Sequence, residues 1–91
     1  MSDRVARHVV VHGRVQGVFF RDTTRRQAER RRVSGWVRNR WDGTVEAHFE
    51  GDPESVESMI AFCRKGPRGA DVEHVDVEDA EPQGLDRFAI R

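Results

Sequence analysis

GRVQGVFFR, residues 13–21, joins an apolar run to a helix-like run through two glycines and ends on an arginine. The preceding residues, Val5 to His12, are predicted to form a strand, because three consecutive valines mark their centre. Glycines let backbone N–H groups converge on one point, a helix N-terminus carries partial positive charge, and arginine supplies a forked cation. The stretch therefore predicts a loop that binds an anion such as phosphate.

A helix is expected directly after this loop, from Thr23 to Val33. Asp22 or Thr23 suits its N-cap position, and Gly35 lies just beyond its expected end. Ala28 and Val33 are its clear apolar contacts, so the helix is only weakly amphipathic.

A hairpin is expected around Asp42-Gly43, with strands from Trp36 to Trp41 and from Thr44 to Glu50. Period-two alternation in the second of these strands gives one apolar face, formed by Val45, Ala47 and Phe49.

The pairing register of the hairpin follows from the length of its loop. A three-residue loop with a left-handed glycine pairs Val37 with Ala47 and Asn39 with Val45, which puts the apolar residues on one side. A two-residue loop would pair Val37 with His48 and place a valine on the polar side. The sequence therefore predicts the three-residue loop.

A second helix is expected to start at Asp52-Pro53-Glu54, with Asp52 as cap and Pro53 in the first helical position, and to end at Gly66-Pro67. Its buried face is marked by helical spacing of Val56, Met59, Ile60 and Cys63. Val72 to Asp79 and Arg87 to Ile90 are expected to supply the last strand pairing.

The order of elements predicts an α+β fold, the ferredoxin-like βαββαβ sandwich. In it, two helices cover one face of an antiparallel sheet, and a short fifth strand follows. The 91 residues suit one domain, residues 1–91. Strands one and two of this fold run parallel, so their ends meet at one edge. That edge brings together the loop, Arg21 and Asn39, which are far apart in the sequence.

Charged residues make up 35% of the chain and hydrophobic residues 36%, which predicts a lean core beneath a charged surface. Residues 1–50 carry eleven arginines against six acidic residues, and the remainder is acidic by the same margin. The basic half is compatible with an anionic substrate or with nucleic acid, and equally with two solvated faces that attract each other. The longest apolar run, Met59–Cys63, is too short for a membrane span.

The single cysteine and the polar N-terminus, which lacks a signal-peptide hydrophobic region, predict a cytoplasmic protein. Cys63 lies on the apolar face of the second helix and is expected to be a small core residue. The histidines lie in strands without metal-ligand spacing, so no zinc site is predicted. Core or core-edge positions are expected for Trp36, Phe49, Phe62 and Phe88.

Two blocks, residues 13–21 and Gly35-Trp36-Val37-Arg38-Asn39, together resemble the acylphosphatase family. Family-like spacing extends to Asp42-Gly43, Glu50-Gly51 and Gly66-Pro67, so the resemblance covers almost the whole chain. It implies hydrolysis of the carboxyl–phosphate bond of acyl phosphates to carboxylate and inorganic phosphate, without metal or cofactor.

The resemblance also implies the roles of particular residues. Arg21 would bind the phosphoryl group and Asn39 would position the attacking water. The phosphate-binding loop would comprise Arg14, Val15, Gln16, Gly17, Val18, Phe19 and Phe20. Inorganic phosphate is then expected as product and competitive inhibitor. We expect a monomer that acts on small acyl phosphates, with acyl-phosphorylated proteins as a further substrate class, and that binds neither nucleic acid nor membrane.

The sequence departs from the family pattern late in the first helix, where Arg31 and Arg32 replace the leucine and glycine that members commonly carry. We expect this difference to affect stability or helix packing rather than the active site. Arg31 would keep its stem buried and its charge in water.

Two other functions use similar features. RNA-recognition modules share this strand order and stack bases on exposed aromatics. Here only Phe49 is aromatic on the central strands, and Glu46 and Glu50, expected on the exposed face, would repel phosphates. A domain that senses phosphate without turnover would keep the loop, but retention of both Arg21 and Asn39 favours hydrolysis.

Overall fold

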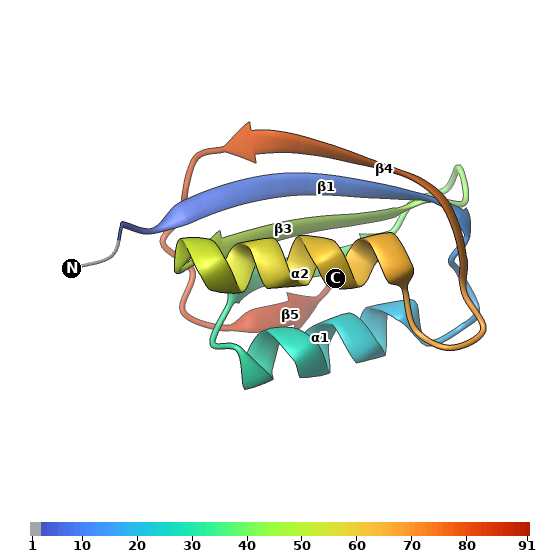
Figure 1. Ribbon diagram of the computed structural model, residues 1–91, viewed down its shortest axis with the longest axis horizontal. Coiled ribbons are helices and arrows are strands. Elements are labelled where there is room, and N and C mark those ends of the chain that lie inside the picture. The colour runs from blue at the N-terminus through green and yellow to red at the C-terminus, as the bar shows by residue number, and fades with distance from the viewer. Residues whose placement is uncertain (1–2) are drawn as a thin grey trace.

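The computed structural model describes residues 3–91 and contains one five-stranded sheet (Figure 1). Strand β1 (Val5–Arg14) lies inside this sheet, and its central valines are buried. Met1 and Ser2 of the predicted domain lie outside the described residues. The order of strands across the sheet is β4-β1-β3-β2-β5. The other elements are α1 (Phe20–Arg30), β2 (Ser34–Asn39), β3 (Val45–Gly51), α2 (Pro53–Lys65), β4 (Asp71–Ala80) and β5 (Phe88–Ile90).

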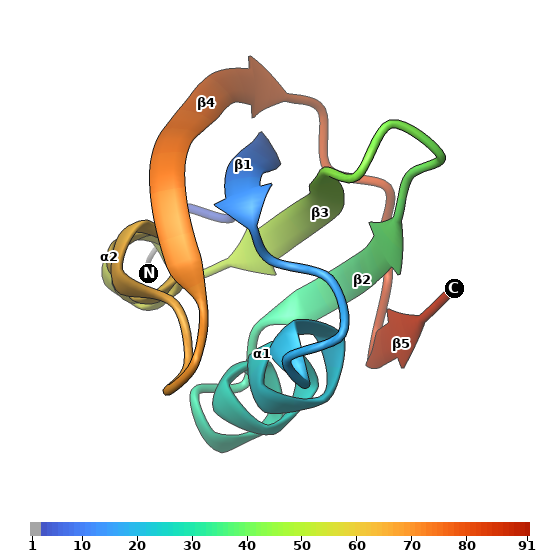
Figure 2. The ribbon, with the colours of Figure 1, turned by 90° about the vertical axis from the view of Figure 1, so that its right-hand side faces the viewer.

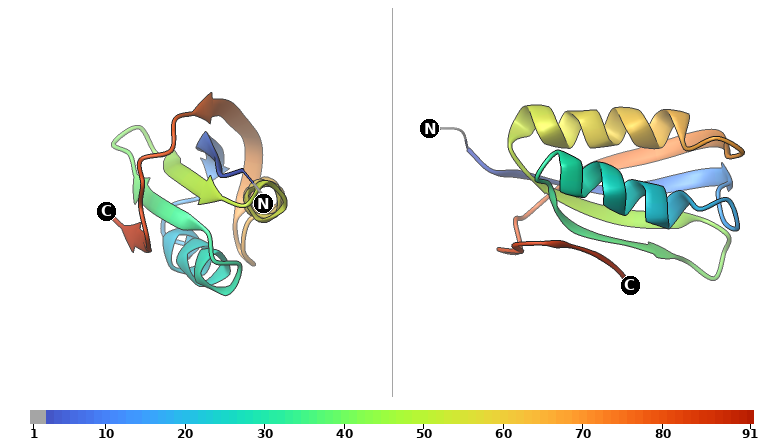
Figure 3. Two further views of the ribbon diagram at one scale, coloured as in Figure 1. Left: turned by 90° about the vertical axis from the view of Figure 1, so that its left-hand side faces the viewer. Right: turned by 90° about the horizontal axis from the view of Figure 1, so that it is seen from below.

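The predicted topology is confirmed. β1 pairs antiparallel with β3 and β4, and β3 pairs antiparallel with β2, so β1 and β2 run parallel with β3 between them. Both helices lie on one face of the sheet (Figure 3). β5 joins the outer edge of β2 in the parallel direction, so the ferredoxin-like sheet is mixed rather than antiparallel throughout.

The predicted hairpin register is also confirmed, with Val37 opposite Ala47. The backbone N–H of Arg40 donates to the carbonyl of Thr44 over 2.9 Å, which closes a loop of three residues. Gly43 in this loop has φ of 91°, a conformation that favours glycine.

The core lies between the sheet and the two helices. α2 begins and ends where the sequence predicts, although the Asp52 side chain makes no capping hydrogen bond. The predicted apolar face of α2 is buried: Val56, Met59, Ile60 and Cys63. Neither helix found in residues 3–91 has the length and apolar character needed to cross a membrane.

The two tryptophans occupy opposite environments. Trp36 on β2 is buried, but on the face of the sheet away from the helices, because the next residue, Val37, belongs to the core. Its ring stacks on His48 at 6.1 Å between ring centroids, and the Arg91 guanidinium lies 5.0 Å from the ring centroid. Trp41 lies in the hairpin loop with 97% of its surface exposed. Only Trp36 is therefore shielded by folding.

The predicted start of α1 is wrong by three residues. The helix begins at Phe20, because Phe19 adopts a left-handed conformation (φ 60°) and its carbonyl accepts the N–H of Thr23 over 3.0 Å. Asp22, a predicted cap, lies inside the first turn, where its carboxylate accepts hydrogen bonds from Arg25 and Arg26.

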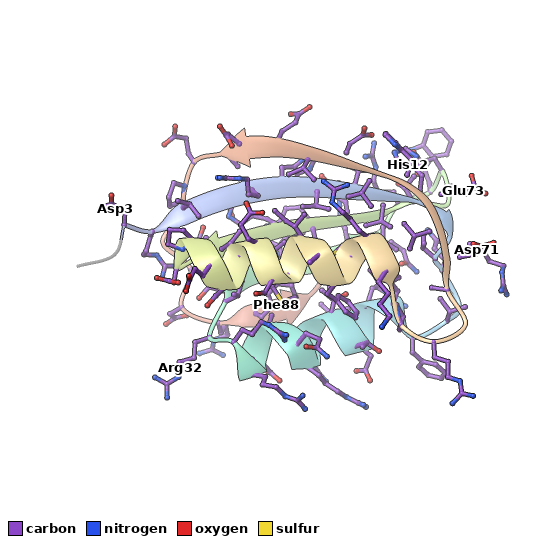
Figure 4. All side chains as sticks on the ribbon, viewed as in Figure 1. Asp3, His12, Arg32, Asp71, Glu73 and Phe88 are labelled. Atoms are coloured by element: carbon purple, nitrogen blue, oxygen red, sulfur yellow. The ribbon has the colours of Figure 1, made fainter. Side chains whose placement is uncertain are left out.

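The predicted end of α1 at Val33 is wrong too. Arg32 takes a left-handed conformation (φ 58°), and the N–H of Val33 donates back to the carbonyl of Ala28 over 2.8 Å. This is the Schellman arrangement, in which glycine usually occupies the left-handed position. Figure 4 shows Arg32 at the outer end of α1. Arg31 is half-buried, and its guanidinium donates to the side-chain oxygen of Gln27.

Gly35 does not close this helix but lies within β2. A Cβ built on it would meet the carbonyl oxygen of His48 at 1.8 Å. The glycine is therefore required for the close approach of β2 and β3.

We expect Arg32→Gly to stabilise the protein by about 0.5–1 kcal/mol. A left-handed conformation costs a residue with a Cβ about 1–2 kcal/mol, and part of that gain is offset by the freer unfolded chain of glycine. Thermal unfolding should show a melting temperature raised by about 2–8 °C.

Arg30→Gly is the matched control, because Arg30 is in the last helical position of α1. Glycine there should destabilise the protein by up to about 1 kcal/mol. Shifts of the same sign in the two variants would contradict the assignment of strain to Arg32.

Glu50 was expected on the exposed face of the sheet, and this prediction is wrong. The side chain does lie on the face away from the helices, but it is fully buried because the segment between β4 and β5 covers it through Gln83 and Leu85. Its carboxylate accepts the backbone N–H groups of Gln83 and Leu85, each at 2.7 Å, and contacts His48 at 2.7 Å and Arg4 at 3.2 Å.

We expect this buried carboxylate to make the fold acid-sensitive. Burial acts to raise the pKa of Glu50, but the hydrogen bonds from Gln83, His48, Leu85 and Arg4 outweigh it and lower the pKa from 4.5 to about 2. A lowered pKa stabilises the fold above pH 4.5, and that stabilisation, of order 3 kcal/mol, is lost as the pH falls towards 2.

Urea unfolding of the parent, Glu50→Gln and Glu73→Gln at pH 7, 4.5, 3 and 2 would measure this loss. Glu73 is an exposed residue of β4, so its variant should follow the parent. Glu50→Gln should be less stable at pH 7 and should lack this part of the acid-induced decline. An equal decline in all three proteins would contradict the role of Glu50.

Candidate active site

The loop between β1 and α1 and the hairpin after β2 meet at one end of the sheet, which faces the viewer in Figure 2. A cavity of about 580 Å³ opens there. Its lining comprises Val15, Gly17, Phe19, Phe20, Arg21, Asp22, Asn39 and Ile90. The structure thus brings Arg21 and Asn39 to a common cavity, as the sequence predicts.

Arg21 is the second residue of α1 and is exposed to solvent. Among residues 3–91 it forms no ion pair, whereas the neighbouring Asp22 is paired with Arg25 at 3.3 Å and with Arg26 at 2.9 Å. The cavity therefore combines an arginine without a carboxylate partner and the positive end of a helix, both of which favour an anion.

Asn39 is the last residue of β2 and faces this cavity from the side of the sheet. Its side-chain oxygen Oδ1 is buried and accepts no hydrogen bond from the residues that the structure describes. A buried acceptor of this kind is normally satisfied by a partner, and water or a substrate group can supply one here. Asn39 is thus able to hold a hydrogen-bond donor inside the cavity.

The loop is braced against the hairpin by Gln16. Its side-chain amide donates to the backbone carbonyl of Arg40 over 2.7 Å and to that of Thr44 over 3.0 Å. These bonds fix the loop relative to the residues just beyond Asn39. Gly17 in the same loop has φ of 74°, which favours glycine.

Three residues of the predicted binding loop do not line this cavity. Arg14 is exposed at the end of β1, opposite Asp71 in the strand register with β4. Gln16 turns to the hairpin, and Val18 lines a separate cavity on the other side of Phe19.

The described residues contain no group of three histidine, cysteine or acidic side chains that could hold a metal ion. Cys63 is buried in the core, and burial raises the pKa of its thiol to about 12. The thiol is therefore not a nucleophile at neutral pH.

A protein-family model described as acylphosphatase matches residues 7–90, which include every residue that lines the cavity. The chain belongs to the acylphosphatase family. The predicted resemblance is confirmed, and with it the class of reaction: hydrolysis of the carboxyl–phosphate anhydride of an acyl phosphate.

Other acylphosphatases match over nearly their whole length. That of Natronomonas pharaonis is 54% identical over 91 residues, which is 100% of this chain and 99% of the relative. The solved acylphosphatase of Coxiella burnetii has a TM-score of 0.94 at 35% identity and covers 98% of this chain and 94% of its own. That of Bacillus subtilis has a TM-score of 0.92 at 34% identity, covering 96% and 98%.

Two residues that line the cavity, Asp22 and Ile90, were not predicted from the sequence. The side chain of Asp22 is also typical of a helix cap, so its residue type gave no signal for a place in the site. Ile90 belongs to β5, and its parallel pairing with Val37 places it beside the end of β2. The last two segments were expected to supply one strand pairing, but β4 pairs with β1 and β5 with β2, so the sequence did not indicate the position of Ile90.

Proposed function

We propose that this chain hydrolyses acyl phosphates in the cavity between the residue 13–21 loop and β2, with Arg21 binding the phosphoryl group and Asn39 positioning the attacking water. The observation that carries the proposal is the placement of both side chains on one cavity at the start of α1. The reaction releases a carboxylate and inorganic phosphate.

Charge neutralisation supports the role of Arg21. In phosphoryl transfer, negative charge is spread over the three equatorial oxygens of the transferring group, and positioned donors that face this charge lower the barrier. Arg21, the start of α1 and the backbone N–H groups of Val15–Phe20 are the donors that we assign to it. Asp22 forms ion pairs with Arg25 and Arg26 rather than with Arg21, so the charge of Arg21 remains available to bind the phosphoryl group.

The unpartnered Oδ1 of Asn39 supports its role toward water. This oxygen accepts a hydrogen bond from the attacking water and directs the water's lone pair at phosphorus. As the O–P bond forms, the bond from phosphorus to the acyl oxygen breaks, and its electron pair leaves with the carboxylate. A phosphate oxygen of the substrate takes the proton of the water, so no side-chain base is required.

We also propose the wider setting of this reaction: a single domain of residues 1–91 that acts as a cytoplasmic monomer. Small acyl phosphates are the substrates, with acyl-phosphorylated proteins as a second class. No cofactor, nucleic acid or membrane takes part. The densely charged surface and the single buried cysteine support this setting.

Release of phosphate from benzoyl phosphate, measured in the presence of EDTA, tests the proposal. We expect turnover that EDTA does not affect, and competitive inhibition by inorganic phosphate. A folded protein that binds phosphate without releasing it from benzoyl phosphate would instead support the phosphate-sensing alternative.

A further inference from the structure

A second cavity, of about 720 Å³, lies next to the first. It is bounded by α1, by the end of α2 and by the segment that joins α2 to β4. Phe19 lines both cavities, so the two cavities adjoin at this residue, and 81% of its surface is exposed. This volume lies within the range of about 300–1,000 Å³ that is typical of small-molecule sites.

The two cavities lie on opposite sides of the start of α1. The first is formed on the side of β2 and β5, through Asn39 and Ile90. The second is formed on the side of α2, through Phe62 and Lys65. Figure 2 shows this arrangement, with β2 and β5 to one side of α1 and α2 to the other.

The positions of the two cavities match the geometry of in-line displacement at phosphorus. The attacking and leaving oxygens lie on opposite sides of phosphorus. If Asn39 holds the water on the β2 side, the acyl group must leave on the opposite side, towards Phe19 and the second cavity. We propose that the second cavity binds the acyl leaving group of the substrate, and this inference rests on the proposed function.

The side chains in the second cavity indicate which acyl groups it accepts. Val18, Phe19 and Phe62 offer apolar surface, and Lys65 and Arg68 add two cations. Neither cation forms an ion pair within residues 3–91. The matching substrate has an apolar or aromatic acyl body with a second anionic group at its far end, as in the monophosphate of a dicarboxylic acid.

A pair of substrates tests this specificity: 4-carboxybenzoyl phosphate, which carries the second anion, and benzoyl phosphate, which lacks it. The measured quantity is the ratio of their kcat/KM values at low ionic strength, where charge effects are least screened. Comparing this ratio between variants cancels the intrinsic reactivity of the two substrates.

The variant Lys65→Gln/Arg68→Gln should lower this ratio about tenfold relative to the parent, because two attractions at partly solvated sites are lost. The matched control is Arg30→Gln/Arg64→Gln, which removes the same charge from exposed positions of α1 and α2 outside this cavity. The control should keep the ratio of the parent, and circular dichroism should show both variants folded.

The outcomes separate this inference from the proposed function. Turnover of benzoyl phosphate with one ratio in all three proteins would overturn the leaving-group site and leave the hydrolase intact. An equal fall of the ratio in the control would show a general charge effect and would also overturn the site. A folded parent that hydrolyses neither substrate would overturn the proposed function and the site with it.

Discussion

Arg21→Ala should lower kcat/KM for benzoyl phosphate by about a thousandfold or more, which is the range found when a cation that stabilises a transferring phosphoryl group is removed. Arg21 is exposed at the start of α1 and has no ion pair within residues 3–91, so its removal should hardly affect the fold. Competitive inhibition by inorganic phosphate should weaken as well, because the same side chain binds the phosphoryl group in substrate and product.

Arg21→Lys distinguishes the shape of the guanidinium from its charge. Lysine keeps the charge but lacks the planar fork that binds two oxygens at once, so only part of the activity should return. Arg30→Ala, from the same helix, is the control and should retain the activity of the parent. Full activity in Arg21→Ala would remove this residue from the mechanism.

Asn39→Ala should lower kcat by about a hundredfold or more, since one positioned hydrogen-bonding group is lost from the transition state. Inhibition by inorganic phosphate should be nearly unchanged, because Asn39 acts on water rather than on the phosphoryl group. The two variants are therefore told apart by one assay: phosphate inhibition weakens in Arg21→Ala and persists in Asn39→Ala.

Asn39→Asp provides the second comparison at this position. Aspartate can accept a hydrogen bond from water, but its charge repels the phosphoryl group. We expect low activity and weak phosphate inhibition together. If Asn39→Ala instead lost phosphate inhibition and kept kcat, the side chain would bind phosphate and the assignment to water would be wrong.

Elements could be predicted from the sequence where the residues at their ends and the spacing of their apolar residues indicate the same structure. Asp52-Pro53 and Gly66 fix the ends of α2, and its buried residues repeat at helical spacing. In the hairpin, the turn at Asp42-Gly43 and the alternation of Val45, Ala47 and Phe49 agree on one register. Local chemistry and burial are satisfied together in these elements, so the structure follows the pattern.

The bounds of α1 could not be predicted because side chains with a Cβ occupy both left-handed positions. Phe19 precedes the helix and Arg32 follows it, where sequence rules expect a polar cap and a glycine. Asp22 suits a cap by type, but its carboxylate binds Arg25 and Arg26 instead. Tertiary packing of the loop decides the start of this helix, and a local pattern does not contain that information.

The meeting of Arg21 and Asn39 could be predicted because strand order alone determines it. Parallel β1 and β2 end at one edge, whatever the details of the loop. The position of Ile90 depends on which edge the last strand joins. The burial of Glu50 depends on the path of the segment before that strand, where two backbone N–H groups find its carboxylate. Neither path has a repeating pattern in the sequence.

The contrast between the two tryptophans gives the protein a built-in optical probe. Trp41 is surrounded by water in the folded chain, so its fluorescence spectrum should change little when the chain unfolds. Trp36 passes from a shielded position against His48 to full hydration, so the spectral change on unfolding comes mainly from this one indole. A fluorescence melting curve therefore reports the unfolding of the sheet around β2, and quenching by a soluble agent in the native state reports the hairpin loop that contains Trp41.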